Sequence, residues 1–182
     1  MHETPEDKLN KLKNEPVEKL MDEVFEIRNT GLQCLRLEQD FENNVLDLSK
    51  KHTEALSQIS WWEKLKNWGE IQKNKELVEK ILKERDETRV ARFLNVLDIL
   101  AQTSMFACAV LIYKKDELSI IQKQKLQDVT EFAIKLIERI TKEKIPVQLK
   151  EKNSELVLID YFSKPNFKFN ASVLDREKFD YL

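Results

Sequence analysis

Apolar residues recur along most of this chain at alternating spacings of three and four residues, the pattern of amphipathic helices. The longest run covers residues 16–59, and its positions are Leu20, Val24, Ile27, Gly31, Cys34, Glu38, Phe41, Val45, Leu48, His52, Ala55 and Ile59. Further apolar residues widen this heptad pattern beyond an isolated coiled coil, which favours a helix inside an intramolecular bundle. Glycine costs about 1 kcal/mol relative to alanine in a helix interior, so a kink at Gly31 would fit the pattern.

The rest of the chain predicts four more helical segments. Thr4, Pro5, Glu6 and Asp7 combine a capping side chain, a proline suited to a first turn and two carboxylates, which predicts a short helix ending near residue 14. Amphipathic patterns then predict a charged helix over residues 70–86, an apolar central helix over residues 88–113 and a last helix over residues 118–144.

Composition supports an all-α fold. Only 2 Gly and 4 Pro occur in 182 residues, too few for the turns of a sandwich, barrel or doubly wound sheet. We therefore predict an antiparallel helical bundle of about four long amphipathic helices with a short N-terminal helix. The bundle would cover residues 1–145, and residues 146–182 would form an irregular, aromatic-rich C-terminal tail, packed on the bundle or partly disordered. Residues 156–162 fit either a short strand or a helical turn.

Charge and cysteine usage narrow the location and the partners. The 31 basic and 33 acidic residues nearly cancel, so the chain lacks the positive field that gathers nucleic acid, and we expect no nucleic-acid partner. The first residues are polar and acidic, unlike a signal peptide, which indicates a cytoplasmic protein. Cys34 and Cys108 lie in apolar helical patterns, so we expect buried thiols in a reducing compartment rather than a disulfide between helices.

The sequence offers no catalytic machinery. Its two histidines are His2 and His52, and neither has the glutamate three residues earlier that a di-iron bundle requires. His52 lies on the heptad pattern, where a core or partly exposed position is expected. Glycines occur only at 31 and 69, so no phosphate-binding loop can form. We therefore expect no enzyme, no cofactor and no metal site.

Two carboxylates interrupt apolar helix faces. Glu38 could pair with a cation on a facing helix or mark where the apolar pattern meets water, and we favour the second interpretation because buried charge is rare. Asp98 lies in the central helix near Arg92 and Gln102. A structural polar contact is the expected role of Asp98.

All three tryptophans lie in one short segment beside Lys64 and Lys66. At a helix corner such rings would cap the end of the bundle core, which is the location that we favour. They would alternatively anchor a partner protein, since tryptophan is enriched at binding hot spots, or lie in a membrane interface. The candidate partner-binding residues are Trp61, Trp62, Leu65 and Trp68.

The expected function is that of a non-enzymatic protein-interaction module, an adaptor or regulatory protein. It would bind another protein or a second copy of itself through the tryptophan corner, the exposed part of the long heptad helix or the tail. The alternative is a membrane-associating protein that conceals its apolar helix, residues 90–113, and exposes it to bind lipid or permeabilise a membrane. The charge-free stretch, residues 99–113, is shorter than the roughly 18 residues that mark a spanning helix. A small-molecule or lipid carrier with a large apolar cavity between the helices is a third possibility.

Overall fold

Six helices make up the computed structural model, which describes residues 5–145 and 147–164. They are α1 (Pro5–Asn14), α2 (Val17–Gln58), α3 (Trp61–Lys66), α4 (Trp68–Tyr113), α5 (Ile120–Thr141) and α6 (Ser154–Ser163). Helix accounts for 85% of the structure, and no strand occurs in the described ranges. Helices α2, α4 and α5 pack against one another, which confirms the predicted all-α bundle.

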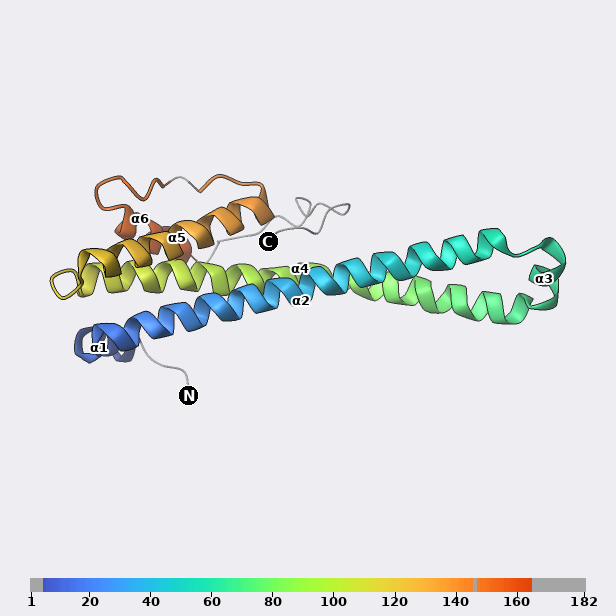
Figure 1. Cartoon of the computed structure of the whole chain (residues 1–182), viewed down its shortest axis with the longest axis horizontal. Helices are drawn as coiled ribbons and strands as arrows, with labels where there is room; N and C mark the ends of the chain where they lie inside the picture. Colours follow the sequence, from blue (N-terminus) through green and yellow to red (C-terminus); the bar gives the residue numbers. More distant parts are fainter. Residues whose placement is uncertain (1–4, 146, 165–182) are drawn as a thin grey trace.

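Helices α2 and α4 form an antiparallel pair that runs the full length of the molecule (Figure 1). The 46 residues of α4 span about 70 Å at 1.5 Å per residue. Helices α1, α5 and α6 lie at one end of this pair, and together with that end of α2 and α4 they form the body of the protein. At the other end α2 and α4 continue as a two-helix arm that carries α3 at its tip. We define the arm as residues 46–84, the range in which no residue is buried.

The hydrophobic core lies entirely in the body. One part of it joins α2, α4, α5 and α6 around the fully buried side chains of Phe93, Leu100, Ile137 and Leu158. A second part lies at the other end of the body, around Leu20 and other residues of α1, α2, α4 and α5. No residue of the arm is buried to this degree. The arm is therefore a projection from the core and has no core of its own.

The helices predicted over residues 70–86 and 88–113 are one continuous helix, α4. Thr88, the expected start of the second helix, instead donates its hydroxyl to the carbonyl of Glu84 one turn earlier. Such a bond satisfies the hydroxyl inside a helix, so Thr88 does not act as a cap. Gly69 lies in the first turn of α4. The described residues therefore contain three long helices where about four were expected.

Helix α2 continues through Gly31 without a break. The glycine permits a close approach of α4, because a Cβ atom at this position would lie 3.1 Å from Cγ2 of Ile99. Beyond Gly31 the buried positions of α2 are Leu35, Glu42 and Val45, whereas Cys34 is half-buried and Phe41 is exposed. Two successive spacings of four residues, Ile27 to Gly31 to Leu35, form a stutter in the heptad pattern, so contacts predicted at Cys34 and Phe41 fall one residue later. Val45 is buried as the pattern predicts.

The open assignment for residues 156–162 is resolved as helix, because these residues belong to α6. Leu158 and Phe162 of α6 are buried in the core of the body, and α6 packs against α4. The later aromatic residues of the predicted tail, beyond residue 164, lie outside the described residues.

Candidate functional site

Helix α3 turns the chain at the far end of the arm. Its local sequence fixes this turn through a capping box, in which Ser60 Oγ accepts from the backbone N–H of Glu63 and Glu63 Oε2 accepts from the backbone N–H of Ser60. Asn67 ends α3, and its carbonyl accepts bonds from Glu70 and Ile71 in the first turn of α4. The residues that precede α3 and follow it thus hold it between the two long helices.

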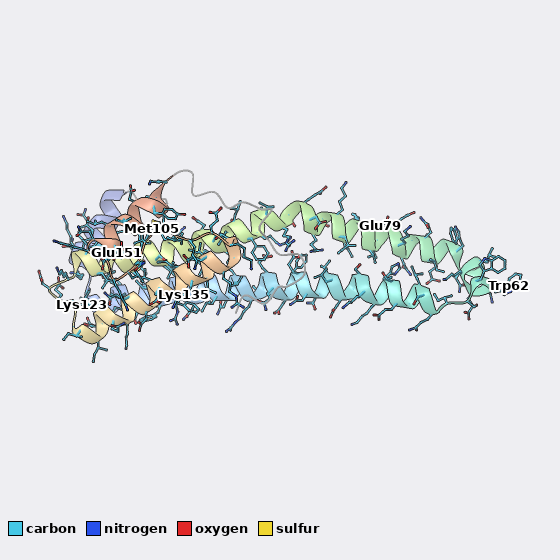
Figure 2. The ribbon with its side chains drawn as sticks, turned by 90° about the horizontal axis from the view of Figure 1, so that it is seen from above. Trp62, Glu79, Met105, Lys123, Lys135 and Glu151 are labelled. Carbon is cyan, nitrogen blue, oxygen red and sulfur yellow. The ribbon has the colours of Figure 1, made fainter. Side chains whose placement is uncertain are left out.

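The four candidate partner-binding residues lie together at this tip and are exposed. Their exposed fractions are 63% for Trp61, 75% for Trp62, 53% for Leu65 and 64% for Trp68. The rings of Trp61 and Trp62 meet edge to face with centroids 4.6 Å apart. Figure 2 shows Trp62 at the extreme end of the molecule. We call these four residues the tryptophan tip.

The expected capping of the bundle core by the tryptophans is wrong. The core ends in the body, and the arm consists of two helices, so no core reaches the tip for these rings to cover. The polar neighbours of the rings carry both signs of charge, with Lys66, Glu63 and Glu70 exposed. The tip is therefore an aromatic surface surrounded by polar side chains.

An ionic network lies inside the helix pair where the arm meets the body. The side chain of Glu42 is fully buried, and its two carboxylate oxygens accept from Arg85 Nε at 2.6 Å and from Arg92 Nη2 at 2.6 Å. Arg92 Nε also donates to Glu38 Oε2 at 2.6 Å, and Arg89 Nε lies 3.8 Å from Glu42 Oε2. Because buried charges need partners, this network should hold α2 and α4 in one register.

The network corrects the interpretation of Glu38, whereas Asp98 lies outside the network. Glu38 is partly buried against Arg92 of the facing helix, so it does not mark the point where the apolar pattern meets water. Asp98 is exposed and accepts from Gln102 Nε2 at 2.7 Å, the local polar contact that was expected.

His52 is half-buried in the arm, in the partly exposed position expected of it. Its Nε2 is buried and has no hydrogen-bond partner within the described part of the chain. Among the described residues, no group of three or more His, Cys, Asp and Glu side chains is arranged to hold a metal ion.

Both cysteines are free thiols, and Cys108 is buried. Burial raises the pKa of the Cys108 thiol from 9.0 to about 12, although a hydrogen bond with Thr130 acts in the opposite direction. A nucleophilic cysteine must be a thiolate, so Cys108 is chemically inert near neutral pH.

The raised pKa also makes folding stability sensitive to high pH. The folded chain keeps the Cys108 proton between pH 9 and about 12, whereas the unfolded chain releases it. The stabilising contribution is therefore complete below pH 9 and is lost as pH rises towards 12. Denaturant titrations across this range should show a decline in unfolding free energy that is smaller in Cys108→Ala. Equal declines in the two proteins would contradict the assignment.

A cavity of about 540 Å³ opens between α1, α2, α4 and α6. Apolar side chains such as Met105, Phe106 and Ile159 line part of it, and an ion pair between Lys11 and Glu23, 2.6 Å apart, lies in the same lining. Its volume is in the range of small-molecule sites. The mixed lining differs from the large apolar cavity expected of a lipid carrier.

Helix α4 also contains an 18-residue window that is long and apolar enough to cross a membrane, judged by length and composition alone. Of that window, 56% is buried inside the structure. The buried core helix of a soluble bundle has the same length and apolar composition, so this window is weak evidence for a membrane-spanning helix.

Fold and surface together define an all-α bundle with a projecting two-helix arm and an aromatic tip. Comparison of the chain with protein-family models, with curated proteins and with solved structures gives no match in any of the three.

Proposed function

We propose that this protein is a non-enzymatic, cytoplasmic interaction module that binds another protein through the tryptophan tip. The observation that carries the proposal is the exposure of all three tryptophans of the chain at the end of an arm. Exposed aromatic clusters with polar surroundings are typical of binding surfaces, and tryptophan is among the residues most enriched at binding hot spots.

The arm supports this proposal by its geometry. From Arg85 to Trp68 it extends about 25 Å at 1.5 Å per helical residue, which keeps the body away from a protein bound at the tip. The edge-to-face contact of Trp61 with Trp62 and the capping box of α3 hold the tip in one arrangement, so less conformational entropy is lost on binding.

The test combines capture with stability. A photo-activated cross-linking amino acid at position 62 should yield a discrete protein adduct in a cell extract, and alanine at Trp61 and Trp68 should remove that adduct. Loss of one hot-spot residue, at about 2 kcal/mol or more, weakens binding by about 30-fold, so loss of two weakens it by about 700-fold where their effects add. The same cross-linker at Lys135, an exposed position on α5, is the control and should give no such adduct.

Stability separates a binding role from a structural role. Because the tip lies outside the core, the double alanine variant should keep the helical circular dichroism and the unfolding midpoint of the parent chain. Loss of the fold in this variant, or equal adducts from positions 62 and 135, would overturn the proposal.

The second candidate is attachment to a membrane surface, favoured by the exposed indoles beside Lys64 and Lys66. Tryptophan and lysine together are typical of interfacial helices. In a vesicle flotation assay with anionic lipids, co-flotation that is lost in the tryptophan variant would favour this candidate over the protein partner. Absence of co-flotation across pH would eliminate it.

A further inference from the structure

One long side of the arm, continued along α2 as far as Phe41, is more apolar than the other. Helix α2 places three residues on this side at intervals of seven, Phe41, Leu48 and Ala55. Each of them comes directly before a position that faces α4. On α4 the same relation to α2 holds for the half-buried Ile81, with Leu77 beside it, and for the exposed polar Asn74. In an antiparallel helix pair such flanking positions of both helices lie on the same side. We call the five apolar residues the arm stripe; its large side chains, Phe41, Leu48 and Leu77, are 42%, 43% and 57% exposed.

The other side of the arm is polar. Its corresponding flanking positions include Thr53, Gln72 and Glu79, all of which are exposed. Nearer the body this second side meets the core, because Leu46 packs against the cluster that contains Phe93 and residues of α5. Helix α5 therefore lies on the side opposite the arm stripe.

The arm needs more apolar contact than two helices supply. Between residues 46 and 84 no side chain is fully buried, and Leu56, Val78 and Leu82 on the facing surfaces remain half-buried. Most helical stability in proteins comes from packing of an amphipathic face. A second helical layer on the arm stripe would bury these residues further.

We propose that a second copy of this chain covers the arm stripe, with the two arms antiparallel and a two-fold axis passing near Leu48. The spacing of side-chain sizes along α2 carries the proposal. An axis at Leu48 brings the Leu48 side chains of the two copies together. It also places the large side chain of Phe41 opposite the small side chain of Ala55 of the second copy. Large side chains then fill the space that small ones leave, as tight core packing requires.

The available area agrees with a symmetric pair. The outer edge of the stripe side carries charges of both signs, Lys51, Glu70 and Glu84, which lie at the rim of the proposed interface. The two helices present a face of about 33 Å by 20 Å from residue 37 to the tip, on the order of 650 Å² for each copy. Stable interfaces bury about 800 Å² on each partner, so the arm supplies most of this area. Two paired arms would form a four-helix bundle.

This inference adds a partner to the proposed interaction function but uses a different surface from the tryptophan tip. Its test reads the oligomeric state of the purified chain alone. A monomeric chain would therefore contradict the dimer without contradicting the proposal for the tip. A negative result of the cross-linking experiment would likewise contradict the proposal for the tip without contradicting the dimer.

The first experiment measures mass by sedimentation equilibrium. The full chain should be a dimer at micromolar concentrations, and Leu48→Glu should raise the dissociation constant by about 100-fold or more, because two carboxylates would meet on the axis. Thr53→Glu places the same charge on the polar side of the same helix and should leave the dimer unchanged. Both sites are exposed, and thermal unfolding of each variant should verify that the fold is retained.

The second experiment exchanges side-chain sizes across the axis. Phe41→Ala and Ala55→Phe should each weaken the dimer, and the double variant should recover at least part of the lost affinity, because the large-to-small pairing is restored in reverse. Phe41 also stacks on Arg92 of its own chain, 4.5 Å from the ring centroid to the guanidinium carbon. Recovery on adding Ala55→Phe, which is remote from Arg92, would not follow from that contact.

A monomer at all concentrations up to the solubility limit would overturn the inference. It would equally be overturned by a dimer that Leu48→Glu leaves intact, or by single size variants whose defects add in the double variant.

Discussion

Replacing Glu42 with alanine is expected to lower the free energy of unfolding by about 3–5 kcal/mol, the usual effect of removing one partner from a buried ion pair. The carboxylate is fully buried and accepts short bonds from both Arg85 and Arg92. Without it, the largely buried guanidinium of Arg85 loses its closest anion, while the cost of its burial remains. Urea denaturation followed by circular dichroism measures the change.

Asp47→Ala on the same helix is the matched control, because Asp47 is exposed. Its effect should stay within about 0.5 kcal/mol, as for most surface substitutions. A loss below about 1 kcal/mol in Glu42→Ala would mean that the network contributes little to the pairing of α2 with α4.

Replacing Phe93 with alanine is expected to cost a similar amount, about 3–5 kcal/mol, for a different reason. Phe93 is fully buried in the cluster that joins α2, α4, α5 and α6, and its removal leaves a cavity as well as lost apolar burial. Leu94, the next residue, is 39% exposed, and Leu94→Ala should have a much smaller effect. Equal losses in the two variants would show that the core does not lie where the structure places it.

Local pattern was sufficient to predict most of the helices. Pro16 separates α1 from α2 and occupies the N-cap position of α2, because the residue before a proline is pushed out of helical geometry. The apolar spacing after residue 118 predicted α5 within a few residues at each end. These features depend on neighbouring residues alone, which explains why the sequence was a sufficient guide to the all-α bundle.

The ionic network was missed because it depends on register between two helices. The heptad pattern of the sequence predicts contacts at Cys34 and Phe41. In the structure Gly31 lies close to α4, and the buried positions are instead Leu35 and Glu42. A signal was present in α4, where Arg85, Arg89 and Arg92 follow at helical spacing on one face. Burial of a charged group is costly unless the group is paired, so three arginines on a helix face that packs against another helix predict carboxylates on that second helix.

The location of the tryptophans depends on the length of the arm, which is a global property. The spacing of the tryptophans predicts that they share one face of a helix, but it does not predict whether that face packs against the hydrophobic core. Only the continuous course of α4 from Trp68 to Tyr113, with the body at one end, places the tip beyond all other helices.

Exposure of the tryptophan tip is the central claim, and collisional quenching of fluorescence tests it most directly. All three tryptophans of the chain lie between residues 61 and 68, so intrinsic fluorescence reports on the tip alone. In dilute native protein, acrylamide should quench the emission almost as efficiently as in the unfolded chain, and the spectrum should be that of indole in water. Protected indoles with blue-shifted emission would place these rings in a core and contradict the proposed binding surface.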